Sequence, residues 1–195
     1  LSNFIGWQIA AISELAVSSG RVAPVMLQPQ YNLLTRYIEL EVVPACLEYG
    51  LGLIPWSPLG GGWLTGKYAR DSLPTGASRL GEDPTRGMEN YDSRNADPKV
   101  WDIIDAVKEV AGRTGLTMAQ VALAWVADRP GVTAPILGNR TTEQLAEALA
   151  IADVHLDEDD LVALTEVSAP DVPQYPYGPM GQSQRSRPIS GGRAS

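Results

Sequence analysis

The stretch Leu51-Gly52-Leu53-Ile54-Pro55-Trp56-Ser57-Pro58-Leu59-Gly60-Gly61-Gly62 decides the fold of this chain. It opens as a short apolar run that Pro55 ends before a helix could form, so we predict a buried strand. Strands covered on both faces are typical of parallel sheets in α/β proteins. The glycines that follow expose backbone N–H groups with no side chain in the way, which suits a phosphate or a flat ligand. The alternative is a buried tryptophan followed by an ordinary glycine-rich turn.

The composition is that of one globular domain. The chain has 195 residues, of which 44% are hydrophobic and 19% are charged. A net charge of −8 argues against nucleic acid as the main partner. We expect no membrane span, because no apolar run approaches the ~20 residues that a spanning helix needs. The single cysteine, Cys46, cannot form an internal disulfide, which favours a cytoplasmic location, and its apolar neighbours predict a packed core thiol.

Apolar periodicity predicts alternating helices and strands. Two further strands are expected, at 22–28 and at 132–137. Pro44 predicts a kink or an irregular first turn in the second helix. In the helix after residue 140, Leu145, Leu149 and Ala152 are expected to face inward. The predicted helices run from Gly6 to Ser19, from Thr35 to Tyr49, from Pro98 to Gly115, from Thr117 to Pro130, from Thr141 through Ala152, and from Asp157 through Val167.

Alternating strands and helices predict a parallel sheet. Three complete strands cannot close a barrel, so the chain is either a small doubly wound domain or part of a (β/α)₈ barrel. It begins at Leu1 with no initiator Met, and we expect it to be cut from something longer. The polar segment 69–97 is expected to be a functional lid or a disordered insertion. Residues 1–168 form the predicted domain, and Pro, Gly, Ser and Gln after it predict a flexible or disordered tail over 169–195.

A match to the P-loop pattern spans Gly61 to Lys67. The pattern requires Ser or Thr at the next position to hold Mg²⁺, and this chain has Tyr68. A P-loop must also run directly into a helix, whereas a loop is predicted after Tyr68. We therefore reject an ATP-binding P-loop.

The sequence offers few groups of residues that could form a catalytic or metal-binding site. The only histidine, His155, lies between two predicted helices and far in sequence from every strand end. Neither a Ser-His-Asp set nor a zinc cluster can be built around it, so we predict no metal site. The acidic run 157–160 opens a helix, where negative charge complements the helix dipole.

The ends of the strands carry the polar groups that matter. Ser2-Asn3 precedes the first helix, where a strand would finish, and Gln28 and Trp56 end the next two strands. Gly138-Asn139-Arg140 follows the last strand and opens a helix. In a barrel these points share one rim, where they could hold an amide-bearing ring, a pyrophosphate and a further phosphate. The ordered set indicates a dinucleotide.

These motifs resemble the aldo-keto reductase family. The resemblance covers roughly residues 1–168 and is carried by 2–4, by Gln28-Pro29-Gln30-Tyr31-Asn32, by 55–68 and by Pro135-Ile136-Leu137-Gly138-Asn139-Arg140-Thr141-Thr142-Glu143-Gln144-Leu145. It implies a partial (β/α)₈ barrel, comprising about strands 5 to 8 with their helices. It also implies NADPH as cofactor and a small-molecule aldehyde or ketone as substrate.

The resemblance assigns roles to single residues. Ser2, Asn3 and Gln28 would bind the nicotinamide carboxamide, and Trp56 would stack on the ring, where many relatives place Tyr. Arg140 would meet the 2′-phosphate of NADP, and Gln144 and Glu147 would approach the adenosine, although Ala148 stands where relatives often have Asn. The pyrophosphate would lie against Ser57, Pro58, Leu59 and Gly61, with Gly138 and Asn139 completing the cofactor-binding set.

The family's catalytic Tyr, Asp, Lys and His come from its first four strands, which the resemblance does not cover. Tyr31, Lys67 and His155 lie in the wrong segments for those roles. Hydride transfer leaves an alkoxide that needs a placed proton donor, so we predict no reductase activity for this chain alone. The alternative is a non-catalytic nucleotide-binding or regulatory protein. Open barrel edges would promote self-association.

Overall fold

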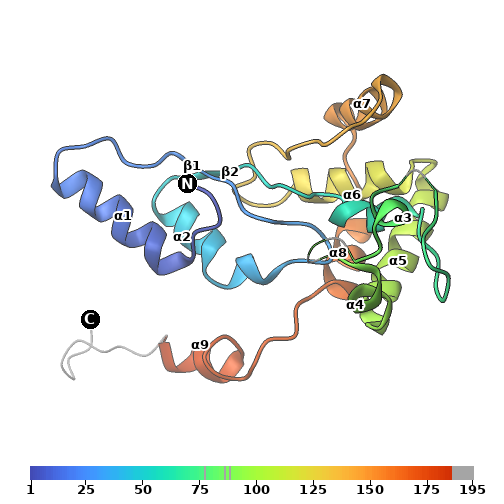
Figure 1. Cartoon of the computed structure of the whole chain (residues 1–195). Helices are drawn as coiled ribbons and strands as arrows, with labels where there is room; N and C mark the ends of the chain where they lie inside the picture. Colours follow the sequence, from blue (N-terminus) through green and yellow to red (C-terminus); the bar gives the residue numbers. More distant parts are fainter. Residues whose placement is uncertain (77, 86, 88, 186–195) are drawn as a thin grey trace.

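A computed structural model of the chain gives the fold, and the structure describes residues 1–76, 78–85, 87 and 89–185. Short parallel strands lie in the centre, with α1 and α2 at one end of the molecule and α5, α6 and α8 at the other (Figure 1). The elements are α1 (Gly6–Ser18), β1 (Met26–Leu27), the 3₁₀ helix η1 (Tyr37–Leu40), α2 (Val42–Glu48), β2 (Gly52–Leu53), η2 (Gly60–Thr65), α3 (Arg79–Glu82), α4 (Tyr91–Asn95), α5 (Pro98–Thr114), α6 (Met118–Ala127), α7 (Thr142–Leu149), η3 (Ala150–Asp153), α8 (Glu158–Val167) and α9 (Pro179–Arg185).

The strands pair in parallel and in chain order. β1 and β2 pair with Leu27 opposite Leu53, and both side chains are fully buried. Ser2 forms a parallel bridge with Gln28, the residue that follows β1, and Leu53 of β2 forms a parallel bridge with Val132. The prediction of a parallel α/β arrangement is confirmed.

The prediction of a regular strand at 132–137 is wrong for most of its length. Only Val132 forms a bridge, although Thr133 N donates to Leu53 O at 2.8 Å and Ile136 N donates to Pro55 O at 2.7 Å. Pro135 lies between these donors and has no N–H to give, which interrupts the ladder. The segment still runs beside β2.

The helix predicted at 35–49 divides into two. The 3₁₀ helix η1 ends before Glu41, whose φ of −139° breaks the helical path, and α2 starts at Val42. Pro44 falls in the first turn of α2, where its missing N–H would have no intrahelical partner. Pro44 predicted a kink at that residue or an irregular first turn, and the break in the structure lies three residues earlier, at Glu41. Cys46 is fully buried on α2, and burial raises the pKa of its thiol to about 11, as expected for a core cysteine.

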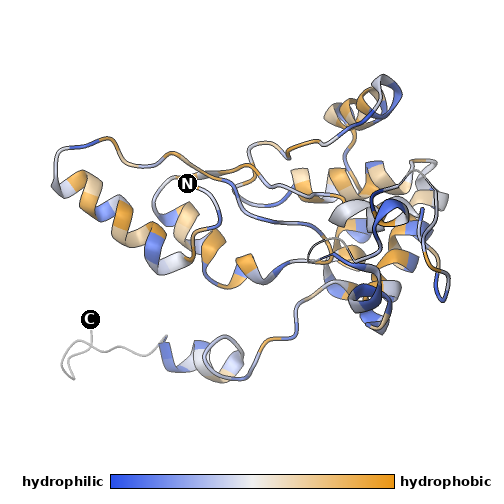
Figure 2. Ribbon diagram, in the orientation of Figure 1, coloured by the Kyte–Doolittle hydropathy of each residue, from blue (hydrophilic) through white to orange (hydrophobic). Residues whose placement is uncertain are grey.

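The larger core lies between α5, α6 and α8, whose apolar residues face one another (Figure 2). Trp125 is fully buried there and has a guanidinium on each of two sides, with Arg129 at 4.7 Å and Arg36 at 5.2 Å from its ring. Buried Arg36 is in turn paired with Glu39 at 2.7 Å. The charges are therefore satisfied inside the core, as buried charges must be.

Segment 69–97 was predicted to be a functional lid or a disordered insertion, and its described residues contain the helices α3 and α4, which argues against the second alternative. Aromatic packing holds it in place: Trp63 is fully buried and stacks on Tyr91 at 5.7 Å between ring centroids. Leu80 of α3 is buried in the same cluster. The rings of Tyr91 and Tyr68 come from an apparently polar sequence, and their burial anchors the segment against η2 and α5.

The inward face predicted for α7 is wrong. Leu145 and Leu149 are 42% and 57% exposed and Ala152 is exposed as well, whereas Ala148 is the buried residue. Helix α7 projects from the upper end of the molecule and packs against α6 (Figure 1). A methyl group permits close approach, and the larger apolar side chains are left on the surface.

The predicted tail begins with a segment that docks on the domain. Lys99 Nζ donates to Ala169 O, and Tyr177 Oη donates to Glu41 Oε1, each at 2.5 Å. Composition did not predict α9, which follows at Pro179–Arg185. Flexibility or disorder over 186–195 was also predicted, and those residues lie outside the described part. No helix in the described ranges is both long and apolar enough to cross a membrane.

Tyr31 is expected to make the free energy of unfolding depend on pH in the alkaline range. Burial and a 2.6 Å hydrogen bond to Glu39 raise the pKa of Tyr31 far above 10.0. Since the unfolded tyrosine ionises first, this stabilisation is complete below about pH 10 and is lost as pH rises above it. We predict that Tyr31→Phe removes a pH dependence of about 1.4 kcal/mol per pH unit from urea unfolding above that pH.

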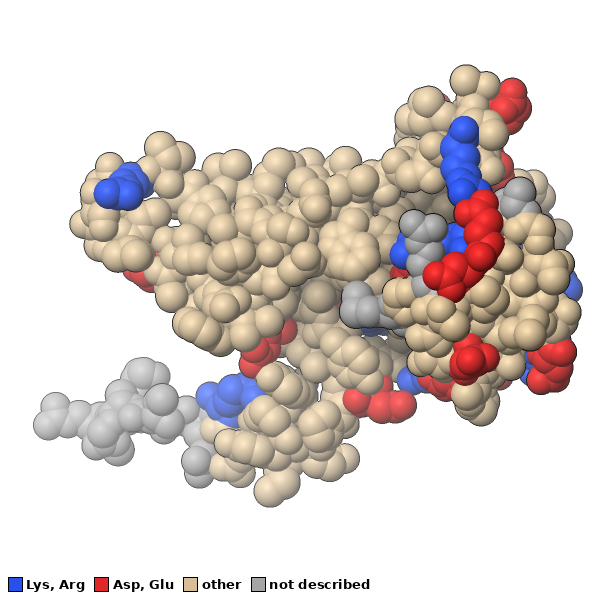
Figure 3. Space-filling model, viewed as in Figure 1, with Lys and Arg blue, Asp and Glu red and all other residues tan. Residues whose placement is uncertain are grey.

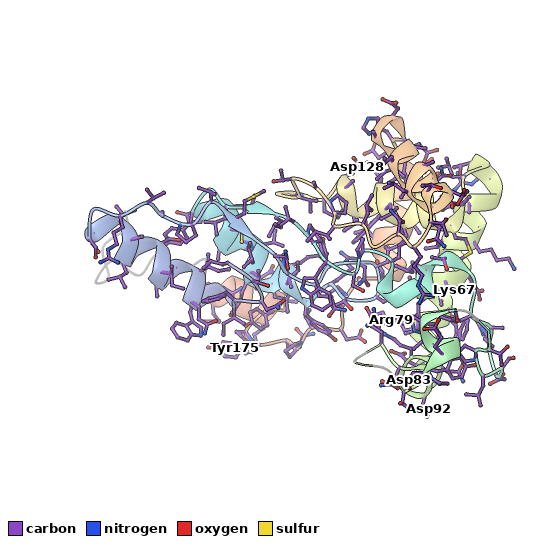
Figure 4. The ribbon with its side chains drawn as sticks, turned by 45° about the horizontal axis from the view of Figure 1, so that its top comes forward. Lys67, Arg79, Asp83, Asp92, Asp128 and Tyr175 are labelled. Carbon is purple, nitrogen blue, oxygen red and sulfur yellow. The ribbon has the colours of Figure 1, made fainter. Side chains whose placement is uncertain are left out.

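The matched control is Tyr175→Phe, because Tyr175 is 67% exposed (Figure 4). Its unfolding curves should keep the wild-type pH dependence. Equal slopes for wild type and Tyr31→Phe would contradict this account of the buried tyrosine.

Candidate functional site

The carboxyl ends of the parallel segments meet at one edge. Trp56 Nε1 donates to Asn3 Oδ1 at 2.9 Å, and Ser2 Oγ donates to the backbone oxygen of Gln28 at 3.2 Å. Asn3 and Ser57 have left-handed φ values of 58° and 54°, a conformation that costs about 1–3 kcal/mol in a residue other than glycine and clusters at functional sites. Because the indole uses Asn3 Oδ1, the Asn3 amide nitrogen is the atom that can donate to a ligand.

A tight glycine turn follows Ser57. Gly60, Gly61 and Gly62 have φ values of 56°, 65° and 96°, which favour glycine. Gly61 N donates to Ser57 Oγ at 3.2 Å, closing the turn. A Cβ on Gly62 would fall on the Cε and Nζ atoms of Lys67. The missing side chain thus leaves room for the lysine to fold back beneath the turn.

The glycine turn forms one wall of a cavity of about 670 Å³. Segments after β2 and residues 137–140 contribute one side, and α6 and α7 contribute another. The residues that line the cavity are Ser57, Pro58, Leu59, Gly61, Gly62, Thr65, Lys67, Ser78, Arg79, Thr117, Ala119, Gln120, Leu123, Leu137, Gly138, Asn139, Arg140, Gln144, Glu147 and Ala148. The volume and the polar lining suit a ligand of nucleotide size.

Positive charge gathers in this cavity. Lys67, Arg79 and Arg140 all line it, and Figure 4 labels the first two. Burial lowers the pKa of the Lys67 ammonium, and the charges of Arg140 and Arg79 lower it further. Three cations lining one cavity favour an anionic ligand between them.

Carboxylates from segment 79–97 contact the same cations and the glycine turn. Buried Glu89 accepts hydrogen bonds from Ser57 Oγ at 2.8 Å and from Gln30 Nε2 at 2.9 Å, and it lies 3.9 Å from Arg79 Nη1. Glu82 pairs with Arg140 at 3.3 Å. The segment is thereby fastened across the cavity by charge as well as by its aromatic side chains.

One buried donor in the cavity has no partner. Asn139 Nδ2 is shielded from solvent and makes no hydrogen bond to any described residue. An orphaned buried donor is costly, about 1–3 kcal/mol, and is rare without a functional reason. Because Asn139 lines the cavity beside Arg140, an acceptor atom of a ligand could satisfy it.

The predicted site residues fall into two adjoining groups. Asn3, Gln28 and Trp56 meet at the strand ends together with Ser2, and they do not line the cavity. The second group lines it in full: Ser57, Pro58, Leu59, Gly61, Gly138, Asn139, Arg140, Gln144 and Glu147. The two groups adjoin in the chain, because Trp56 and Ser57 are consecutive residues.

Sequence reasoning missed Lys67, Ser78 and Arg79. The P-loop pattern contained Lys67, but the pattern was rejected and its lysine with it. The turn that follows η2 is not a P-loop, yet it does bring the lysine to the cavity. Ser78 and Arg79 belong to segment 69–97, whose sequence has no periodicity that could have located them.

Comparison with known proteins decides the family. The aldo/keto reductase family matches residues 1–169. The chain belongs to the aldo/keto reductase family. Proteins of this family fold as a (β/α)₈ barrel.

Individual relatives of this chain are found in plants, bacteria and fungi. A probable voltage-gated potassium channel subunit beta of Oryza sativa subsp. japonica is 36% identical over 155 residues, 76% of this chain and 45% of that protein. An uncharacterized oxidoreductase of Bacillus subtilis (strain 168) is 35% identical over 169 residues, 85% of this chain and 47% of that protein. Versiconal hemiacetal acetate reductase of Aspergillus parasiticus is 32% identical over 174 residues, 87% and 47% of the two chains. The chain spans about half the length of these relatives.

Substituting Gly62 tests how the turn places Lys67. In Gly62→Ala the new methyl group overlaps the lysine and the φ of 96° is strained, so we predict destabilisation by about 1–3 kcal/mol in urea unfolding. Gly112→Ala is the matched control, because Gly112 lies in α5 with nothing within 4 Å of an added Cβ. Alanine there should stabilise by up to about 1 kcal/mol through helix propensity. Similar effects of the two substitutions would contradict the geometry described.

Proposed function

We propose that this chain supplies the NADPH-binding half of an aldo-keto reductase that reduces aldehydes and ketones to alcohols. The observation that carries the proposal is the Asn3–Trp56 hydrogen bond at the strand ends, directly followed in the chain by Ser57, which lines the same cavity as Arg140. These residues and their neighbours offer, in order, an aromatic face with amide groups, a glycine turn with cations, and a further cation. Those are the groups that a nicotinamide, a diphosphate and a 2′-phosphate require.

The nicotinamide would bind at the strand ends. The indole of Trp56 offers a flat π-face, and its hydrogen bond to Asn3 fixes the ring plane. The Asn3 amide nitrogen, with Gln28 and Ser2 beside it, would bind the carboxamide. These residues would therefore set which face of the ring meets the substrate.

The diphosphate would lie along the glycine turn. Gly61 permits close approach of the backbone, and Ser57 Oγ, Lys67 and Arg79 supply donors from the surrounding wall. Glu89 holds Ser57 Oγ in the ligand-free chain, so this contact would have to be shared or exchanged on binding. Segment 79–97 would then cover the bound diphosphate, as a lid does.

The adenosine would occupy the remaining part of the cavity. Arg140 would bind the 2′-phosphate through charge-assisted hydrogen bonds. Gln144, whose Oε1 accepts from Arg140 N at 2.9 Å, and Glu147 would line the adenosine pocket with Gly138. The unpartnered Asn139 Nδ2 would gain an acceptor there.

The bound cofactor would supply a hydride to the carbonyl carbon of the substrate. This chain's contribution would be to bind and orient, because the alkoxide needs a proton donor and the tyrosines nearest the site are committed elsewhere. Tyr31 Oη donates to Glu39, and Tyr68 Oη donates to Gly61 O at 3.3 Å. We propose, from the resemblance to the family, that the chain corresponds to about strands 5 to 8 of the barrel, with the proton donor outside it.

We also propose self-association in the cytoplasm through apolar surface at the open end of the sheet. Trp7, Leu15 and Val17 of α1 are 65%, 66% and 67% exposed, and Figure 2 shows apolar residues around much of this helix. Patches of this kind mark interaction surfaces. Nothing in the charge of −8 favours nucleic acid as the partner.

A second candidate function is a non-catalytic nucleotide-binding regulatory subunit. It is favoured by the relatives named as probable voltage-gated potassium channel beta subunits, at 36% and 34% identity. Both candidates need the same cofactor surface. They differ in whether the bound dinucleotide is turned over.

Arg140 should determine the preference for NADPH over NADH. We predict that Arg140→Gln weakens NADPH binding about 10- to 100-fold, since a hydrogen bond to a charged group contributes roughly 1.5–3 kcal/mol, and leaves NADH binding within about twofold. Quenching of tryptophan fluorescence measures both affinities. Lys108→Gln, an equal charge change on exposed α5 surface, is the control and should alter neither. Equal losses for both dinucleotides would contradict the assignment of Arg140.

The chain alone is expected to bind NADPH without reducing carbonyl compounds. Mixing it with NADPH and an aromatic aldehyde should give no fall in NADPH absorbance above the uncatalysed rate, because we place the proton donor of the reaction outside this chain. A heat-denatured sample sets that rate. Saturable turnover would show that a proton donor lies within these residues.

A further inference from the structure

Arg140, which lines the cavity, forms an ion pair with Glu82. Arg140 Nη2 lies 3.3 Å from both carboxylate oxygens of Glu82. Glu82 is the last residue of α3, and Arg140 lies just before α7. The pair therefore joins the proposed lid segment, residues 79–97, to the opposite wall of the cavity. Figure 3 shows acidic and basic atoms in contact where these two elements face each other. The side chains are 58% and 45% exposed for Arg140 and Glu82.

Helix α3 holds Glu82 in this position. Leu80, two residues earlier, is 1% exposed, and its backbone N donates to Tyr68 Oη at 3.4 Å. Ser78 Oγ caps the helix by accepting from Gly81 N at 3.0 Å. A carboxylate held by this short anchored helix reaches Arg140 at little conformational cost.

We infer that Glu82 is a specificity-determining residue that competes with a ligand phosphate for the Arg140 guanidinium. This inference rests on the proposed function, and it names a residue that limits the preference for 2′-phosphorylated nucleotides. A 2′-phosphate must take the guanidinium from Glu82 or share it at close range with a second anion. A 2′-hydroxyl leaves the pair intact, so Glu82 opposes only the phosphorylated ligand.

The competition is unequal, which is why the pair tunes the preference without abolishing it. A phosphate carries more charge than a carboxylate and offers three strong acceptor oxygens. The pair is half exposed, so solvent screens it and it is weak. Glu82 should therefore lower the affinity for the phosphorylated ligand by a small factor.

The test uses isothermal titration calorimetry with two probes, adenosine 2′,5′-bisphosphate and adenosine 5′-monophosphate. We expect Glu82→Gln to raise the affinity for the bisphosphate roughly two- to fivefold, the range of an exposed ion pair, and to leave the monophosphate unchanged. Asp102→Asn makes an equal charge change on exposed α5 surface and should alter neither affinity. Far-UV circular dichroism checks that each variant keeps its fold.

A double variant separates competition from general charge. In an Arg140→Gln background the Glu82→Gln change should lose its effect on the bisphosphate. Two results would overturn the inference and leave the proposed function standing. The first is a ratio of bisphosphate to monophosphate affinity that Glu82→Gln leaves unchanged or lowers, and the second is an equal gain from Glu82→Gln in the Arg140→Gln background. Failure of the wild-type chain to bind either probe would overturn the proposed function and this inference together.

Discussion

The backbone ladder on both sides of Leu53 and Ile54 is the constraint on which the site depends. Leu53 N donates to Gly131 O at 2.8 Å on one side, and Ile54 N donates to Leu27 O at 2.9 Å on the other. Buried N–H groups must be paired, so these bonds fix the register of three segments that are distant in sequence. Since the segments are parallel, their carboxyl ends come out together. Trp56 is thereby brought to Asn3, and the glycine turn to the residues before α7.

A second constraint is the aromatic cluster beneath the lid segment. Trp63 belongs to the glycine turn, and its indole nitrogen donates to the backbone oxygen of Glu89 at 3.0 Å. The same residue that anchors the turn therefore also positions the lid carboxylate over Ser57. Packing and polar contacts reinforce each other here, and the cations of the cavity acquire partners from the chain itself. These cationic groups are thus held in place by the chain itself, which would reduce the entropy lost on binding an anion.

Much of this arrangement could be predicted from sequence because it follows from local rules. A short apolar run ended by Pro55 predicted β2, and the polar residues after each strand predicted the shared edge where Asn3 and Trp56 meet. The failures have equally physical causes. Leu145 and Leu149 lie four residues apart, and helical periodicity correctly places them on one face of α7. Periodicity does not tell which face of a helix packs against its neighbour, and here that face is exposed. The contacts of Glu82 and Glu89 lie in a segment without periodicity, where tertiary packing of aromatic side chains decides the path.

The central claim is that one surface running from the strand ends to α7 binds a nicotinamide dinucleotide. A crystal structure of the chain with NADP⁺ tests it most directly. We predict electron density with the nicotinamide against Trp56, its carboxamide at Asn3 and Gln28, and the 2′-phosphate at Arg140. Density for the dinucleotide on any other surface would contradict the claim.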